Sequence, residues 1–150
     1  MTTATALPAV KAALLALADA AISDSTVEFC YGHPGTNRAK EIISVRDAAT
    51  TLTWGPFGQR DKDENLTIEL VVSCREGGTN QQTVTERAFD LLDLIDTALR
   101  GTANAPSITS TVVFGGINSV QLRESNPAIN DMTKGRVAEL FCTVTAYTIT

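Results

Sequence analysis

Few residues in this sequence have side chains that could carry out chemistry, and those few are scattered. The chain holds one histidine and three cysteines. The nearest approach to a nucleophile and its base is Cys30 with His33. The intervening Tyr31-Gly32 turn does not direct both side chains at one point, so we expect turn and core roles for them. No catalytic residue is predicted.

The cysteines have the pattern of packing residues. Cys30, Cys74 and Cys142 are odd in number, lie far apart, and each stands inside an apolar run typical of a strand. Free cysteine behaves as a small hydrophobic residue, so we expect these thiols to be buried and reduced. A zinc site would need paired ligand spacing, which the sequence lacks.

Two further patterns could hold a ligand, and each has a simpler explanation. Asp90, Asp93 and Asp96 could offer oxygens to a hard cation, but they follow a helical surface without a loop to enclose an ion. Gly77-Gly78 precedes a helix but lacks the GxxxxGK[ST] pattern and a nearby lysine, so it indicates a turn. We therefore expect no metal, no cofactor and no enzymatic activity.

Composition narrows the class of partner. The 150 residues suffice for one core and carry a net charge of −5, with no basic run to neutralise phosphates. An acidic surface suits a protein that lets DNA pass without binding it. The apolar run Ala12 to Ala18 is too short for a membrane span, and we expect no signal peptide because no Lys or Arg precedes it. We predict a single domain over residues 1–150 without a membrane partner.

Two amphipathic helices are expected. The first runs from Leu7 to Ala21, with Pro8 in its first turn, where a missing N–H costs nothing. The second follows Gly77-Gly78 and stops at Gly101, with candidate capping boxes at Thr79–Gln82 and Thr83–Glu86. Their predicted buried stripes are Val10, Ala13, Leu14, Leu17 and Ala21 in the first, and Val84, Ala88, Leu91, Leu92, Ile95, Ala98 and Leu99 in the second.

Strands account for most of the rest. From Leu66 to Arg75, apolar and polar residues alternate as in a half-buried strand, with Val71 the exception on the outer face. This strand and the one before it flank a short charged loop, Arg60 to Glu64, and should pair as a long hairpin. The other predicted strands are Val27 to Tyr31, Glu41 to Arg46, Thr50 to Trp54, Ser110 to Phe114, Ile117 to Glu124 and Gly135 to Thr150. The order predicts an α/β (α+β) fold, a mostly antiparallel sheet with two helices packed on one face.

Some surface residues have no evident role inside one subunit. Leu15 and Phe89 fall on the outer sides of the two helices, and isolated exposed apolar residues are common, so they need no special explanation. The alternative is that they contact a neighbouring subunit. The mixed charges of Arg60, Lys62 and Asp63 at the hairpin tip suit registry with a protein partner. With Phe57 in the preceding turn, these six residues form the candidate assembly interface.

The order of these segments resembles a known family. The first helix begins Leu-Pro-Ala-Val and a strand ends Tyr-Gly-His-Pro; a charged loop leads into Asn-Leu-Thr-Ile-Glu-Leu-Val-Val, followed by a Thr-Glu-Arg-Ala-Phe helix and a long apolar strand. Together these resemble the tail terminator (tail-completion) proteins of long-tailed, non-contractile bacteriophages. The likeness spans nearly the whole chain, but the loop from Asn126 to Lys134 has no counterpart.

The resemblance implies a virion structural protein that works by assembly. Such subunits close into a six-membered ring that caps the tail tube, ends its polymerisation and meets the head connector, while DNA passes through the lumen. The implied partners are further copies of the chain, the tail tube protein and the head connector or neck protein, at the tail–head junction of a particle made in a bacterial cytoplasm. The alternatives are a head-completion or neck protein, or a small ligand-binding domain or enzyme.

Overall fold

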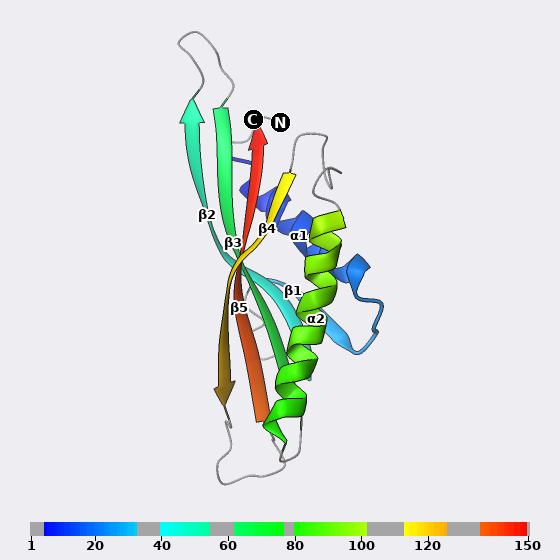
Figure 1. The fold of residues 1–150 in the computed structure, drawn as a ribbon. Coiled ribbons are helices and arrows are strands. Elements are labelled where there is room, and N and C mark those ends of the chain that lie inside the picture. The colour runs from blue at the N-terminus through cyan, green and yellow to red at the C-terminus, as the bar shows by residue number, and fades with distance from the viewer. Residues whose placement is uncertain are drawn as a thin grey trace.

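The fold combines two helices with one sheet. The computed structural model describes residues 5–32, 40–54, 62–76, 80–101, 113–125 and 136–149. Figure 1 shows the helices together on one face of a long, strongly twisted sheet. The elements in chain order are α1 (Leu7–Ala21), β1 (Val27–Tyr31), β2 (Glu41–Trp54), β3 (Lys62–Glu76), α2 (Gln81–Gly101), β4 (Val113–Ser125) and β5 (Arg136–Ile149).

The sheet is mostly antiparallel, as predicted. Its five strands lie in the order β1-β2-β3-β5-β4, and only β1 and β2 pair in parallel. The predicted hairpin is confirmed, since β2 and β3 pair from Glu41 with Cys74 to Trp54 with Lys62. The predicted fold class, α+β with both helices on one face of the sheet, is therefore confirmed.

Two predicted breaks between strands are wrong, because each is an irregularity inside one strand. Glu41 to Arg46 and Thr50 to Trp54 belong to β2, whose register with β3 shifts between Val45 and Ala48. A β-bulge lets a strand bend without ending, so polar residues inside it imitate a turn.

The second wrong break lies in β4, whose register with β5 shifts around two glycines. Gly116 has a φ of 104°, which favours glycine. At Gly115 a Cβ atom would stand 2.5 Å from the Thr145 Oγ1, so only glycine fits there without a shift. These glycines bend β4 where the sequence indicated a turn. The start of the predicted strand, residues 110–112, lies outside the described residues.

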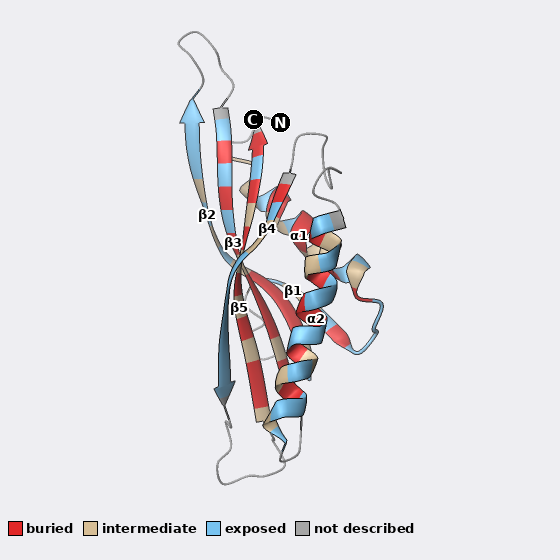
Figure 2. Cartoon of the chain, in the orientation of Figure 1, coloured by how far each residue is buried: buried red, intermediate tan, exposed pale blue. Residues whose placement is uncertain are grey.

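The core fills the space between the sheet and the helices (Figure 2). The predicted stripe of α2 is confirmed except at Ala98, which is half-buried. In α1 the stripe is displaced, because Ala18 is buried whereas Leu17 and Ala21 are only partly covered. Leu15 is also half-buried and packs against the core, so part of its surface is explained within the subunit.

The face of the sheet opposite the helices also has a buried apolar position. Val71 is fully buried there, between its strand neighbours Ser44 and Phe141. The Arg123 guanidinium lies 4.7 Å from the centre of the Phe141 ring, a cation–π contact. The exception in the alternation of β3 is therefore a packed position.

The N-terminus of α2 is capped by a residue that the sequence interpretation passed over. The Asn80 Oδ1 accepts hydrogen bonds from the backbone N–H groups of Gln82 at 3.0 Å and Thr83 at 3.4 Å. An Asn side chain in this position satisfies N–H groups that the helix leaves unpaired. The candidate box beginning at Thr83 is wrong because Thr83 lies inside the helix, and Thr79 is outside the described residues.

Candidate assembly surface

The outer end of the β2–β3 hairpin forms an arm that extends beyond the helices (Figure 1). We define the arm as Thr50–Trp54 of β2 and Lys62–Leu66 of β3, which pair residue by residue. The end of β5 pairs with the β3 side of the arm, from Leu66 with Ala146 to Asp63 with Ile149. The arm therefore continues the sheet together with the end of β5 and, at its base, the start of β4, with its β2 side at the border.

A buried carboxylate fixes the base of the arm to α1. Glu64 has no exposed surface, although the charge run of the sequence suggested a loop residue. Its Oε1 accepts a hydrogen bond from the Ala6 backbone N–H at 2.8 Å, and its Oε2 accepts one from the Thr50 hydroxyl at 2.8 Å. The Thr5 hydroxyl also donates to Oε2 and accepts a bond from the Leu7 N–H at 3.1 Å.

Glu64 therefore caps α1 from a distant part of the chain. The N-cap residue of this helix, Ala6, has no side chain that could cap it by hydrogen bonding. A negative charge at a helix N-terminus is stabilised by the unpaired N–H groups and the helix dipole. Because Glu64 is on β3, the same contacts that cap the helix also set the position of the arm relative to α1.

From the level of Glu64 outward, the helix-facing side of β2 in the arm exposes apolar side chains. Leu52 pairs with Glu64 and Trp54 pairs with Lys62, so both lie on the face of the sheet that carries the helices. Leu52 is 38% exposed and Trp54 is 64% exposed. Large exposed apolar side chains at an extended sheet border are typical of a surface that meets another protein.

A second exposed apolar pair lies on β4, the strand at the opposite border. Val120 pairs with Cys142 and Leu122 pairs with Leu140, and both partners face the helices. Val120 and Leu122 nevertheless remain 44% and 36% exposed. Figure 2 shows this half of β4 exposed along its length, as is the outer half of β2. Apolar residues of one face thus emerge at both borders of the sheet.

The structure describes some of the six candidate interface residues. Phe89 is 37% exposed on α2. Asp63 is exposed, and its carboxylate accepts a hydrogen bond from the Tyr147 hydroxyl at 3.0 Å, which raises the pKa of that phenol. Lys62 is the first residue of β3, whereas Phe57 and Arg60 lie outside the described residues. The described candidates come from three elements: Leu15 from α1, Lys62 and Asp63 from β3, and Phe89 from α2.

The sequence interpretation missed the exposed pairs on β2 and β4. A usable signal was present in the alternation, because Glu64 has the same parity as Leu66 and Ile68 and so had to face inward. Extending the hairpin by register from Glu64 would have placed Leu52 beside it. The exposure of Val120 and Leu122 depends instead on how far α2 covers the sheet, which local sequence does not encode.

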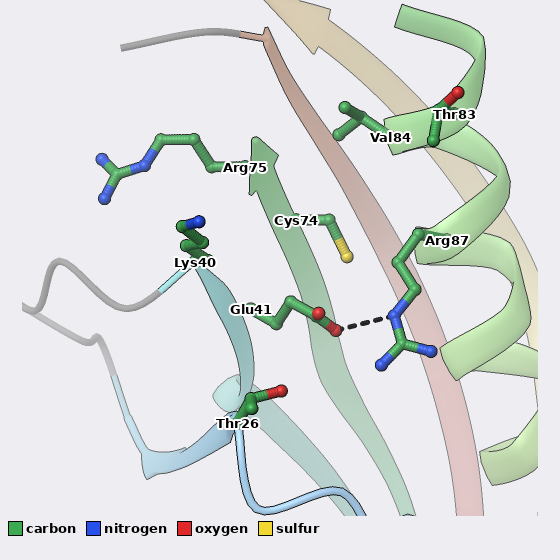
Figure 3. Close-up of a pocket in the computed structure, with 8 residues that line it drawn as sticks. All are labelled: Thr26, Lys40, Glu41, Cys74, Arg75, Thr83, Val84 and Arg87. Atoms are coloured by element: carbon green, nitrogen blue, oxygen red, sulfur yellow. Dashed lines mark hydrogen bonds and ion pairs between the residues drawn. The ribbon is translucent and has the colours of Figure 1, made fainter. Parts of the chain in front are cut away.

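A cavity of about 390 Å³ lies between the N-terminal half of α2 and the ends of β2 and β3 (Figure 3). Its lining residues are Thr26, Lys40, Glu41, Cys74, Arg75, Thr83, Val84 and Arg87. A cavity with a perturbed titrating group is what an enzyme or a ligand-binding domain would show. Whether this cavity could bind or convert a ligand depends on whether its charged groups are already paired and whether its thiol is ionised.

The central cation of this cavity is already neutralised within the chain. The Arg87 Nε donates to the Glu41 carboxylate at 2.9 Å, and its Nη2 donates to Asp24 at 2.8 Å. Figure 3 shows the bond to Glu41 across the cavity. The backbone N–H and hydroxyl of Thr26, together with Arg87, lower the pKa of Asp24. Arg87 thus joins α2, β2 and the turn before β1, which is a structural role.

The thiols are poor nucleophiles. Burial raises the pKa of Cys74 to about 12, helped by the nearby Glu41 carboxylate, and burial also raises the pKa of Cys142 to about 12. Only the thiolate attacks an electrophile, so these groups are unreactive near neutral pH. All three cysteines are free, as expected, but Cys30 is half-buried rather than fully buried. His33, its proposed neighbour, lies outside the described residues.

The remaining charged residues lie on solvated surface. Asp90 and Asp93 are exposed on α2, as predicted, and Asp96 forms an ion pair with Arg100 at 3.0 Å. Within the described ranges no three His, Cys, Asp or Glu side chains are grouped as they would be to hold a metal ion. Neither described helix is long and apolar enough to cross a membrane.

Comparisons with known proteins give a likeness of fold. No family model matches the sequence, and no curated protein matches it. Among solved structures, the chain is similar to a chain described as "Virion of native gene transfer agent (GTA) particle". The match has a TM-score of 0.60 at 12% identity and covers 99% of this chain and 100% of the other. At that identity the likeness establishes that the two chains share a fold along their whole length.

Proposed function

We propose that this chain is a virion structural protein, the tail terminator of a long-tailed phage or phage-like particle. The observation that carries the proposal is the whole-chain likeness to a component of a gene transfer agent virion, at TM-score 0.60. That likeness was found without reference to the sequence resemblance, and both lead to the same class of particle. A fold alone does not determine a function, so the surfaces must also fit.

The surfaces fit a protein that acts by assembly. The arm extends beyond the helices and is fixed at its base by Glu64, and apolar side chains are exposed at both borders of the sheet. At the cavity, Arg87 is paired with Glu41 and Asp24, and burial holds the Cys74 thiol in the protonated form. These features favour protein contacts over catalysis or ligand binding.

In this proposal, copies of the chain close into a hexameric ring on the end of the tail tube. The ring stops tube polymerisation and presents its other side to the head connector, and DNA passes through the lumen without specific binding. Head-to-tail rings need two different contact patches on each subunit. We include Leu15, Phe57, Arg60, Lys62, Asp63 and Phe89 among the residues proposed to contribute to these patches.

The test is electron microscopy of particles made without this gene. The proposal expects overlong or ragged tails beside filled heads that lack tails. Tails of normal length that fail to join heads would instead assign the chain to the neck. Virions of normal form would exclude both roles, and the cavity beside Arg87 would then become the first place to look for a ligand.

A substitution separates the assembly role from folding. Phe89→Asp places a carboxylate on the outer side of α2, where the side chain is 37% exposed. We expect the circular dichroism spectrum and melting temperature to stay close to those of the wild type while complementation of the deleted gene is lost. Full complementation by the variant would remove Phe89 from the interface.

A further inference from the structure

We propose that β4 of one copy pairs antiparallel with the outer half of β2 of the next copy, so that the sheet continues from subunit to subunit. The inference rests on the proposed function in one respect, which is that the partner is a second copy of this chain. It adds the surface, the strand direction and the residues of the contact. The outer half of β2 is defined as Ala48–Trp54.

In the part of the chain that the structure describes, β4 and the outer half of β2 are both borders of the sheet. β4 is last in the order β1-β2-β3-β5-β4, so one of its edges is unpaired in that order. β1 pairs with β2 from Glu41 to Val45, so among the described strands the outer half of β2 has β3 as its partner. A strand edge presents backbone N–H and C=O groups that another strand can bind.

Both edges also contain long stretches without the charges or prolines that commonly block pairing. Edge strands in monomeric proteins are commonly blocked by lysine, other charges or proline. In this chain 19% of residues are charged, yet Ala48–Trp54 and the ten residues from Val113 to Leu122 contain no charged residue and no proline. Such long uncharged edges are expected where the edge has a partner.

The directions of the two edge strands also fit an antiparallel contact between copies. β2 is antiparallel to β3, β3 to β5, and β5 to β4, so β4 runs opposite to β2. When a second copy continues the sheet in the same orientation, β4 of the first therefore meets β2 of the second in antiparallel fashion. The contact joins two different edges, which is the heterologous type that closes a ring.

The exposed apolar side chains of both edges lie on the same face of the sheet. Leu52 on β2 and the pair Val120 and Leu122 on β4 all point to the side of the sheet that carries the helices. Leu52 lies level with Thr148 of β5, through Glu64, whereas Val120 lies level with Cys142. Pairing of the two edges therefore brings these side chains together when the second copy is displaced along the strands by the six residues from Cys142 to Thr148. Their burial would add an apolar contribution of about 25 cal/mol per Å² to the backbone hydrogen bonds.

The experiment introduces two lysines at one edge at a time. Thr51→Lys with Thr53→Lys charges the β2 edge on its polar side, away from Glu64. Val120→Lys with Leu122→Lys charges the β4 edge. Leu94→Lys with Thr97→Lys is the matched control, since both side chains are exposed on α2 and belong to neither edge strand. Circular dichroism and melting temperature establish that each variant is folded.

The oligomeric state of each variant is measured by sedimentation velocity over a concentration series, up to several hundred micromolar. The proposal expects the wild type and the control to form species larger than one chain. Each edge variant alone should remain monomeric. An equimolar mixture of the two edge variants should form a dimer and nothing larger, because it retains one intact β4 edge and one intact β2 edge.

Other outcomes overturn the proposal. A wild type that stays monomeric throughout, or edge variants that assemble normally, would exclude the contact. Assembly by the β2-edge variant alone would indicate symmetric pairing of β4 with β4. The result is separable from the proposed function: edge-dependent assembly with normal tails in the gene deletion would leave the contact standing and exclude the terminator role, and the reverse combination would exclude only this contact.

Discussion

The two ends of the β2–β3 hairpin bury the inward side of β3 in different ways. Near α2, the inward side of β3 consists of Ile68, Leu70 and Val72, all fully buried. In the arm, the inward side has Glu64, which is equally buried but held by hydrogen bonds. On β2, Leu52 pairs with Glu64 and is partly exposed, and Trp54 beyond it is more exposed. The hairpin thus passes from aliphatic packing to a polar anchor and then to an apolar surface.

An apolar residue on this hairpin therefore has a different role according to which helix lies over it. Under α2 it stabilises the subunit, whereas beyond α1 it is available to a partner. The polar anchor marks the boundary, because a carboxylate bound to the start of α1 ends the covered part of the sheet. Four predictions test how sharp this boundary is.

The largest effect is expected in the packed half. Leu70→Ala should lower the free energy of unfolding by about 2–5 kcal/mol, because it removes a fully buried side chain and leaves a cavity. Leu52→Ala, the same change in the arm, should cost less than about 0.5 kcal/mol. Urea denaturation measures both. Equal losses would mean that the arm belongs to the core and that the comparison fails.

The polar anchor should have the next largest effect. Glu64→Ala leaves the Ala6 N–H and two hydroxyl groups without their acceptor, at a cost of about 1–3 kcal/mol. Hydrogen exchange should also accelerate in the first turn of α1, which separates this effect from a general loss of stability. Glu69→Ala, on the other face of the same strand, is the matched control. Unchanged exchange in α1 would show that the anchor does not hold the helix.

The ion pairs of Arg87 should matter less, because this side chain is 37% exposed and solvent screens it. Arg87→Gln is expected to lower stability by less than Glu64→Ala does. Since the pKa of Asp24 is lowered on folding, its contribution is present above its ordinary value of 3.8 and is lost as the pH falls below it. As the pH is lowered below 3.8, the free energies of unfolding of the wild type and the variant should therefore converge. A larger loss than at Glu64 would place the main polar anchor at the cavity instead.

The smallest effect on stability, and the clearest on reactivity, concerns the thiols. In the folded protein at pH 8, a thiol reagent should label Cys30 before Cys74 and Cys142, whose pKa values of about 12 keep them protonated. The unfolded chain releases these protons from about pH 9 upward, so stability is retained below that pH and declines toward pH 12. Rapid labelling of all three in the native state would show that the packed half opens readily.

The sequence was sufficient for the elements that local periodicity determines. α1 begins at Leu7 and ends at Ala21 as predicted, and the alternation from Leu66 onward identified β3. The errors arose where local signals for a break were overridden by pairing. Gly115-Gly116 and the bulge after Val45 interrupt the pattern. The partner strands continue past both irregularities, and pairing with the bent strand resumes on the far side.

The anchor was harder to foresee for a physical reason. Within the charged segment from Arg60 to Glu64, Glu64 has no local feature that sets it apart except its parity with Leu66. Its hydrogen-bond donors, Thr5, Ala6 and Thr50, come from two other parts of the chain. Burial of a carboxylate is favourable only once those donors are in place, so parity could indicate that Glu64 faces inward but not which groups would bind it.

The strand order also has a consequence for synthesis. β5 follows β4 in the chain but lies between β3 and β4 in the sheet. A nascent chain can therefore form the β2–β3 hairpin early, whereas β4 has no place in the sheet until β5 has emerged from the ribosome. The edge proposed to recruit the next copy is then completed last, which would protect incomplete chains on the same messenger RNA from joining one another prematurely.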